Sequence, residues 1–173
     1  PISLTPEEQE AQSAEIAQVA ALRVLEETLL GRGGESTISE EALRHIVTRL
    51  TDEGLVIELF DVPDAALFVG QTDTPSPVTQ EIAGMLARIL RAVDNPIAVQ
   101  GHLASQAVVV RDNPVWDLSI SRVARMRMML EAEKYDPDRI MRMTGFADRS
   151  PIVADSTAVR NNRIEVVVLR SDQ

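Results

Sequence analysis

The sequence predicts an α/β (α+β) domain in which helices pack on a mixed four-stranded sheet, preceded by N-terminal helices. Four runs of strand length are apolar and largely β-branched, at residues 55–60, 97–100, 140–144 and 164–169. Two stretches between them carry apolar residues at helical spacing, at 78–90 and 118–130. The order from residue 54 is therefore β-α-β-α-β-β, and strands separated by helices need crossover connections, which give a mixed sheet. We divide the chain into a helical linker or regulatory segment, residues 1–54, and a sheet-containing domain, residues 55–173.

The N-terminal segment begins with a long acidic helix, predicted over residues 6–30. Thr5-Pro6-Glu7-Glu8 supplies a candidate N-cap, a proline at the first helical position and acids near the positive end of the helix dipole. One apolar stripe follows the helix, through Ile16, Val19, Leu22, Leu25 or Glu26, and Leu29. The glycines at 31, 33 and 34 end it. The stripe needs a cover, which is either the rest of this chain or a second copy.

A second, shorter helix is predicted over residues 39–50. It starts at Ser39-Glu40-Glu41-Ala42, and its apolar residues are Leu43, Ile46, Val47 and Leu50. The first strand, 55–60, is apolar enough to be buried. The stretch 62–77 is rich in Asp, Gly, Thr and Pro and is predicted to be a loop, with Phe68 as its anchor.

The remaining elements follow from the same patterns. The third helix buries Val78, Ile82, Met85, Leu86, Ile89 and Leu90. Asn95-Pro96 makes the turn into the strand 97–100. The fourth helix is capped by Asp117 or Asp112, and it buries Leu118, Val123, Met126 or Arg127, and Leu130. A one-turn helix starts at Asp136-Pro137-Asp138 and precedes the strand 140–144. The last strand, 164–169, is nearly all apolar, which predicts a central place in the sheet.

Composition excludes some classes of function. The net charge is −10, but residues 1–61 hold 13 acids and 4 bases, whereas residues 62–173 hold 14 acids and 13 bases. No basic surface is therefore expected, which argues against nucleic-acid binding. The chain has no cysteine, hence no disulfide and no thiolate metal site. No apolar run reaches the length of about 18 residues that a membrane span needs. The chain starts at Pro1, and we expect a processed product or a fragment with a membrane anchor upstream.

Several short motifs occur together in a characteristic order between residues 55 and 169. They are Leu55-Val56-Ile57-Glu58-Leu59 with Leu67-Phe68-Val69-Gly70, Pro96 to Gly101-His102, Trp116-Asp117-Leu118-Ser119 with Arg122, Gly145-Phe146-Ala147-Asp148 with Pro151, and Asn161-Asn162-Arg163-Ile164. In this order and spacing the chain resembles OmpA-like peptidoglycan-binding domains, and among them the periplasmic region of flagellar stator proteins of the MotB type. The resemblance covers about two-thirds of the chain.

The resemblance implies a binding site for the diaminopimelate residue of the cell-wall peptide. Such a ligand needs a carboxylate for its ammonium group and a guanidinium for its carboxylate, for which arginine offers a planar two-pronged fork. A helix N-terminus nearby adds N–H donors. Arg122 matches the arginine of the family that binds the carboxylate. The implied ligand-binding positions are Arg122, Leu118, Ser119, His102, Ala104 and Arg163.

Three positions depart from the family pattern. Ala104 stands where the family has the aspartate that binds the ammonium, Val115 where it has an asparagine, and Asn162 where it has an arginine. A half-pocket would leave the ligand's ammonium desolvated without a partner. We therefore expect peptidoglycan binding to be weakened, altered or absent, unless Asp117 or a neighbouring residue, Asp112 or Asn113, takes over the role of the aspartate.

Structural roles compete with these binding roles. Arg122 could pair with Asp148 or Asp117, and Arg163 could tie the last strand to a neighbouring loop. His102 follows a strand end without a second histidine nearby in the sequence, so a hydrogen-bonded loop histidine is expected and no metal. The methionines of this region are expected to fill the core, namely Met126, Met128, Met129, Met141 and Met143. No Gly-x-Ser-x-Gly, P-loop or Gly-x-Gly-x-x-Gly motif occurs, so no enzymatic activity and no cofactor are expected.

The resemblance also implies a context for the whole protein. The chain would be the periplasmic, wall-anchoring part of a flagellar stator subunit, held in the inner membrane by a helix that is absent from this sequence. That helix would pair with a MotA-like partner, and the protein would be a homodimer. Two alternatives remain at this point: another OmpA-like anchor of the outer membrane or a lipoprotein, or a protein-interaction module that kept the scaffold after losing its ligand.

Overall fold

The structure is a computed structural model that describes residues 3–31, 38–106 and 114–171. Five strands form one open sheet in the order β1-β2-β5-β3-β4. Their bounds are Ile46–Leu50 (β1), Gly54–Phe60 (β2), Ile97–His102 (β3), Ile140–Gly145 (β4) and Arg163–Leu169 (β5). All neighbours are antiparallel except β3 and β4, which run parallel. The α/β class, the mixed sheet and the central place of the last strand are confirmed.

The sheet has one strand more than the four that were predicted, because the predicted helix over 39–50 was wrong in its second half. The helix α2 spans only Glu40–Leu43, and β1 then pairs with β2. Ile46 is buried and Val47 exposed, which is the alternation of a strand with one face on the core. Gly54 closes the hairpin with a φ of +147°, and a side chain there would come 1.9 Å from the carbonyl oxygen of Val168. The sheet thus starts at Ile46, ahead of the predicted domain start at Leu55.

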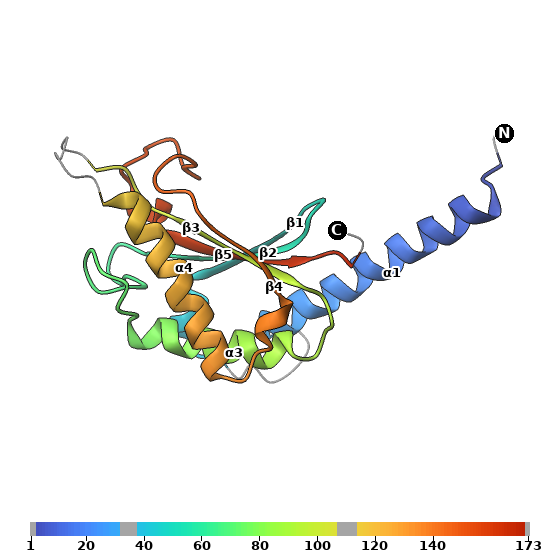
Figure 1. Cartoon of the computed structure of the whole chain (residues 1–173), viewed down its shortest axis with the longest axis horizontal. Coiled ribbons are helices and arrows are strands. Elements are labelled where there is room, and N and C mark those ends of the chain that lie inside the picture. The colour runs from blue at the N-terminus through green and yellow to red at the C-terminus, as the bar shows by residue number, and fades with distance from the viewer. Residues whose placement is uncertain (1–2, 32–37, 107–113, 172–173) are drawn as a thin grey trace.

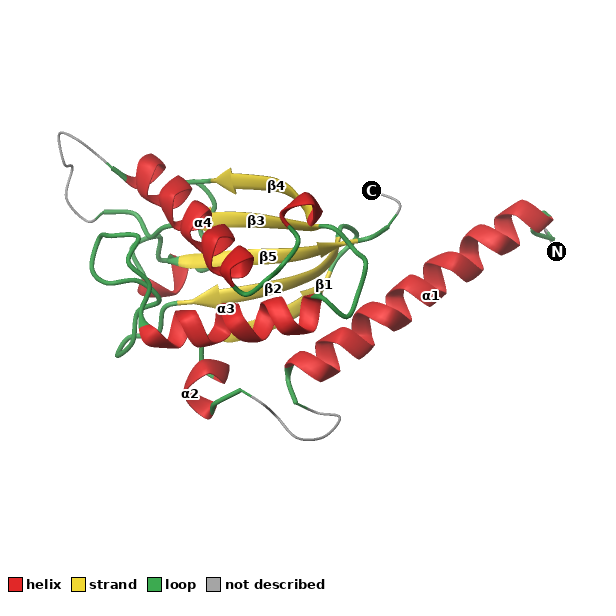
Figure 2. Ribbon diagram, turned by 60° about the horizontal axis from the view of Figure 1, so that its bottom comes forward, coloured by secondary structure: helices red, strands yellow, loops and turns green. Residues whose placement is uncertain are grey.

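Helices cover one face of the sheet (Figure 2). The helices α3 (Pro77–Leu90) and α4 (Val115–Ala132) lie across it, and both carry the predicted apolar faces. Every second side chain of β2, β5 and β3 points toward these helices and joins the core. These side chains include Leu55, Ile57, Leu59, Val99, Ile164, Val166 and Val168. Within the described residues, none of the helices has the length and apolar character needed to span a membrane.

Two details of α4 and its neighbours differ from prediction. The residue at the N-cap of α4 is Pro114, which makes no side-chain cap bond, and Asp117 lies within the first turn, while Asp112 lies outside the described residues. Of the methionines expected in the core, Met126 is fully buried and Met129 packs against the core. The other three are exposed, at Met128, Met141 and Met143. Met141 and Met143 lie on β4, the last strand at one edge of the sheet, which is why they reach solvent.

The helix α1 (Pro6–Leu29) divides into a packed half and a projecting half (Figure 1). Thr5 caps it and forms a capping box with Glu8, as the sequence indicates. Leu22, Leu25 and Leu29 are buried against the domain, which covers this half of the stripe. Ile16, further toward the N-terminus, is 62% exposed. The domain therefore covers only part of the predicted stripe, and pairing with a second copy stays a prediction.

Candidate functional site

Two glycines allow the start of α4 to lie directly on the ends of β3 and β4. A Cβ atom at Gly101 would come 2.6 Å from the carbonyl oxygen of Ser119, and one at Gly145 would come 2.6 Å from its Oγ atom. Ser119 is buried; its hydroxyl donates to the Trp116 carbonyl at 2.9 Å and accepts from the Ala147 amide at 3.2 Å. This close approach fixes the first turns of α4 on the sheet, and with them the position of Arg122.

Arg122 is a buried cation that is held by neutral groups. Its Nε donates to the carbonyl oxygen of Thr72 and its Nη2 to that of Gly70, both at 2.9 Å. The guanidinium carbon lies 4.8 Å from the centre of the Phe68 ring, and only 5% of the residue is exposed. Burial lowers the pKa of Arg122, while the charges of Asp61 and Asp73 act against this shift.

The expected alternative, an ion pair of Arg122 with Asp117 or Asp148, is not what the structure shows. Its hydrogen-bond partners are the two carbonyls of the loop after β2, and among the described residues no carboxylate lies within ion-pair distance of the guanidinium. A buried cation gains more from a charged acceptor than from neutral ones. The site therefore keeps a positive charge that an anionic group would satisfy better.

The carbonyls that hold Arg122 belong to a short turn, residues 69–74. Phe68 and Pro75 pair across its base, and the amide of Val69 donates to the carbonyl of Thr74 at 2.9 Å. Gly70 has a φ of +53°, which favours glycine. Asp73 approaches Arg125 at 3.4 Å, so a second arginine of α4 also contacts the turn.

Two of the three departures from the family pattern, Ala104 and Asn162, are joined by a hydrogen bond. The amide of Ala104 donates to Oδ1 of Asn162 at 2.8 Å, and Nδ2 of Asn162 donates to Oδ2 of Asp61 at 3.1 Å. The other oxygen of Asp61 accepts from the Leu67 amide at 2.8 Å. Burial raises the pKa of Asp61, and these hydrogen bonds oppose the shift. The amide of Asn162 thus links two loops where the family has an arginine.

The predicted site residues fall into three groups. Arg122, His102 and Arg163 line one small pocket, together with Asp61 and Asn162. The space between the lining residues does not admit a water molecule. Leu118 lies instead in a small apolar cluster with Leu103, Val115 and Ala147. Ala104 contributes its backbone amide and Ser119 a structural hydroxyl.

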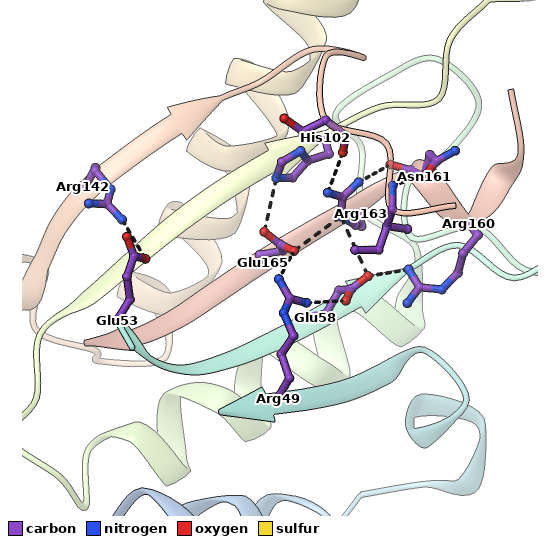
Figure 3. A network of polar contacts seen from close by, with 11 residues as sticks. Arg49, Glu53, Glu58, His102, Arg142, Arg160, Asn161, Arg163 and Glu165 are labelled. Atoms are coloured by element: carbon purple, nitrogen blue, oxygen red, sulfur yellow. Dashed lines mark hydrogen bonds and ion pairs between the residues drawn. The ribbon is translucent and has the colours of Figure 1, made fainter. Parts of the chain in front are cut away.

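The face of the sheet opposite α3 and α4 carries a second polar cluster, which we call the carboxylate pair (Figure 3). Glu58 on β2 and Glu165 on β5 lie opposite each other in register, and both are buried. Arg49 bridges them, at 2.9 Å from Glu58 and 3.0 Å from Glu165. Arg160 donates to Glu58, and Arg163 lies 3.5 Å from Glu165. Two like charges are thus stabilised by arginines on three sides.

His102 and Arg163 belong to this cluster more than to a binding site. Nε2 of His102 lies 3.3 Å from Glu165, and its ring stacks on Phe146 at 4.8 Å. Arg163 donates to the Ser150 carbonyl at 2.8 Å, which is the tie between the last strand and a neighbouring loop that was predicted. Burial raises the pKa of Glu165, but the nearby His102, Arg49 and Arg163 outweigh it and lower the value to about 2.

Sequence reasoning missed the partners of both clusters. Glu58 and Glu165 are single carboxylates inside otherwise apolar strands, and this pattern was a signal, because a buried carboxylate needs a cation beside it. The carbonyls of Gly70 and Thr72 left no signal, since any residue supplies a carbonyl group. Within the residues that the structure describes, no cluster of histidine and acidic side chains could hold a metal ion.

Comparison with known proteins finds relatives in sequence and in fold. No protein-family profile matches the chain. The putative flagellar export/assembly protein LafU of Escherichia coli is 26% identical over 170 residues, which are 95% of this chain and 55% of that protein. Motility protein B of Escherichia coli is 29% identical over 144 residues, 78% of this chain and 45% of that protein. The chain thus spans about half the length of these two relatives.

Solved structures share the fold. A MotB-like protein of Desulfovibrio vulgaris aligns with a TM-score of 0.65 and 18% identity, over 90% of this chain and 94% of that one. The periplasmic domain of Helicobacter pylori MotB aligns with a TM-score of 0.62 and 19% identity, over 73% of this chain and 82% of that one. The cell wall anchor of the T6SS from Pseudomonas aeruginosa aligns with a TM-score of 0.61 and 22% identity, over 76% of this chain and 92% of that one. The predicted resemblance to an OmpA-like domain close to MotB is confirmed.

Proposed function

We propose that this chain is a non-enzymatic cell-wall anchoring domain that binds the peptide of peptidoglycan through Arg122. The observation that carries the proposal is the buried guanidinium of Arg122 in the second turn of α4, which is hydrogen-bonded only to neutral carbonyls among the described residues. A carboxylate is the acceptor that suits such a fork best. Diaminopimelate offers one, and the resemblance to OmpA-like domains names it as the ligand.

The wider context that we propose is a flagellar stator subunit of the MotB type. The sequence relatives LafU and motility protein B support it, as does the Trp116-Asp117-Leu118-Ser119 motif. In that context the domain lies in the periplasm, an upstream helix anchors the protein in the inner membrane beside a MotA-like partner, and two copies form a homodimer. A neighbouring gene for a MotA-like protein with four membrane spans would favour this context over another OmpA-like anchor.

A second candidate function is a protein-interaction module that has lost peptidoglycan binding. The observation that favours it is the closed pocket: Asn162 connects Ala104 to Asp61, and the space between the lining residues does not admit a water molecule. The aspartate that would bind the ligand's ammonium is replaced by Ala104. In this case the domain would be held in place by contacts with other proteins.

A pull-down with purified peptidoglycan sacculi separates the two candidates. The parent domain is compared with Arg122→Lys, which keeps the charge without the fork, with Arg122→Ala, and with Arg127→Ala as a control that removes an exposed arginine of the same helix. Binding by the parent and Arg127→Ala that is lost in both Arg122 variants supports the anchor. If the parent does not bind and Ala104→Asp does, the interaction module is favoured instead.

A further inference from the structure

The two carbonyls that hold Arg122 lie on the edge of its guanidinium that a carboxylate ligand needs. A carboxylate binds an arginine in a two-pronged manner through two parallel N–H donors. Here Nε and Nη2, which form one such pair, donate to Thr72 and Gly70 at 2.9 Å each. The two carbonyl oxygens therefore take the places of two carboxylate oxygens.

The turn 69–74 is built so that it can leave this position without disturbing the core. Its residues are exposed except for the partly buried Asp73, and Val69 is 57% exposed. The base of the turn is fixed, because Phe68 is buried and pairs with Pro75. Besides the two bonds to Arg122, the turn contacts α4 through the half-exposed ion pair of Asp73 with Arg125 at 3.4 Å. A pair of this kind is weak in water.

We propose that the turn 69–74 is an internal ligand of Arg122, which occupies the site in the free protein and must move away when an anionic peptide group binds. The inference rests on the proposed function, since it concerns the regulation of the same site. A ligand carboxylate can displace the turn because it adds the attraction of opposite charges and a planar two-pronged geometry, which two separate neutral carbonyls lack. The cost of moving the turn lowers the apparent affinity, as for any site that is open in only part of the population.

A shortened turn tests this competition directly. Replacing Gly70-Gln71-Thr72-Asp73 by Asn-Gly would join Val69 and Thr74 through a two-residue hairpin turn and remove both carbonyls. The probe is a set of soluble muropeptides from digested sacculi, with binding measured by calorimetry. We expect the shortened variant to bind about tenfold more tightly or better, and we expect this gain to vanish when Arg122→Ala is added.

Two controls keep the test decisive. Gln71→Ala changes an exposed side chain of the turn but keeps both carbonyls, so its affinity should equal that of the parent. Circular dichroism and thermal unfolding show whether the shortened variant is folded. If that variant folds poorly, amide hydrogen exchange of the parent decides instead: muropeptide binding should reduce the protection of the Val69 and Thr72 amides.

The outcomes separate the inference from the proposed function. Equal, measurable binding by the parent and the shortened variant would leave the anchor standing and overturn the internal ligand. Binding by the shortened variant alone would support the internal ligand and explain a closed site in the parent. No binding by either, with both folded, would overturn the internal ligand and count against the anchor as well.

Discussion

Two buried arginines on the same domain are neutralised in opposite ways. Arg122 and Arg163 are each 5% exposed, and burial lowers the pKa of both. Arg163 lies between two carboxylates, at 3.5 Å from Glu165 and 3.8 Å from Glu58. Arg122 is bonded to the carbonyls of Gly70 and Thr72. Arg163 therefore has carboxylates within ion-pair distance, whereas the carboxylates that act on Arg122, Asp61 and Asp73, lie beyond that distance.

The difference distinguishes a structural cation from a binding one. A buried ion pair whose members also bond to other groups is expensive to break, because the remaining charge stays in the protein interior. A buried cation with neutral acceptors loses less when its partners leave, and it gains when an anion arrives. We therefore expect changes at the carboxylate pair to act on stability and changes at Arg122 to act chiefly on binding.

The largest effect is expected from Glu165→Gln. This change removes a buried charge that pairs with Arg49 and Arg163, and breaking such a pair costs about 3–5 kcal/mol of unfolding free energy. Urea unfolding measures the loss. The matched control is Glu53→Gln, whose exposed pair with Arg142 at 3.4 Å should contribute less than about 1 kcal/mol. Equal losses in the two variants would mean that the carboxylate pair does not hold the sheet face together.

Lowering the pH should reduce the contribution of the same cluster to the free energy of unfolding. The pKa of Glu165 is lowered from 4.5 to about 2, so its contribution to stability is fully present above pH 4.5 and is lost as the pH falls toward 2. The shift corresponds to about 3 kcal/mol, at about 1.4 kcal/mol per pKa unit. Urea unfolding at several pH values should show this loss in the parent and a flatter profile in Glu165→Gln. A profile of the same slope in both proteins would contradict the assignment.

Asp61 provides a control of opposite sign for this pH series. Its pKa is raised by burial, so its ionised form is disfavoured in the folded state and the associated cost disappears as the pH falls. Replacing Asp61 by asparagine should therefore make the free energy of unfolding fall more steeply as the pH is lowered, whereas Glu165→Gln should make it fall less steeply. The two variants should move the profile in opposite directions.

A smaller effect on stability is expected from Arg122→Met. The substitution removes two hydrogen bonds from a charged donor, but the freed carbonyls belong to an exposed turn that water can reach, so we expect a loss of about 1–2 kcal/mol. Arg163→Met should cost more, since it leaves Glu58 and Glu165 short of a counter-charge. Urea unfolding of the two variants ranks them. The reverse order would mean that Arg122 is the structural arginine.

The sequence predicted most of the secondary-structure elements and their order, but not the partners of the two buried arginines. The order of strands and helices from residue 54 followed from periodicity, whereas the choice of Arg122, about two turns into α4, followed from the family resemblance. The strand β1 was missed because Ile46, Val47 and Leu50 fit a helical spacing as well as a strand, and only pairing with β2 decides between the two. The partners of Arg122 were missed because backbone carbonyls 50 and more residues away in sequence carry no signature in the chain.

The smallest expected effect concerns the outer contact of the turn 69–74. Arg125→Ala removes the pair with Asp73, whose two side chains are each 36% exposed, so the unfolding free energy should change by less than about 1 kcal/mol. The amides of Val69 and Thr72 should nevertheless exchange faster, because the turn would then be tied to α4 by Arg122 alone. Hydrogen exchange measures this, with Arg127→Ala as the matched control on the same helix. Unchanged exchange in Arg125→Ala would show that Arg122 holds the turn by itself. That result would make the two carbonyl bonds the whole barrier that a ligand has to overcome.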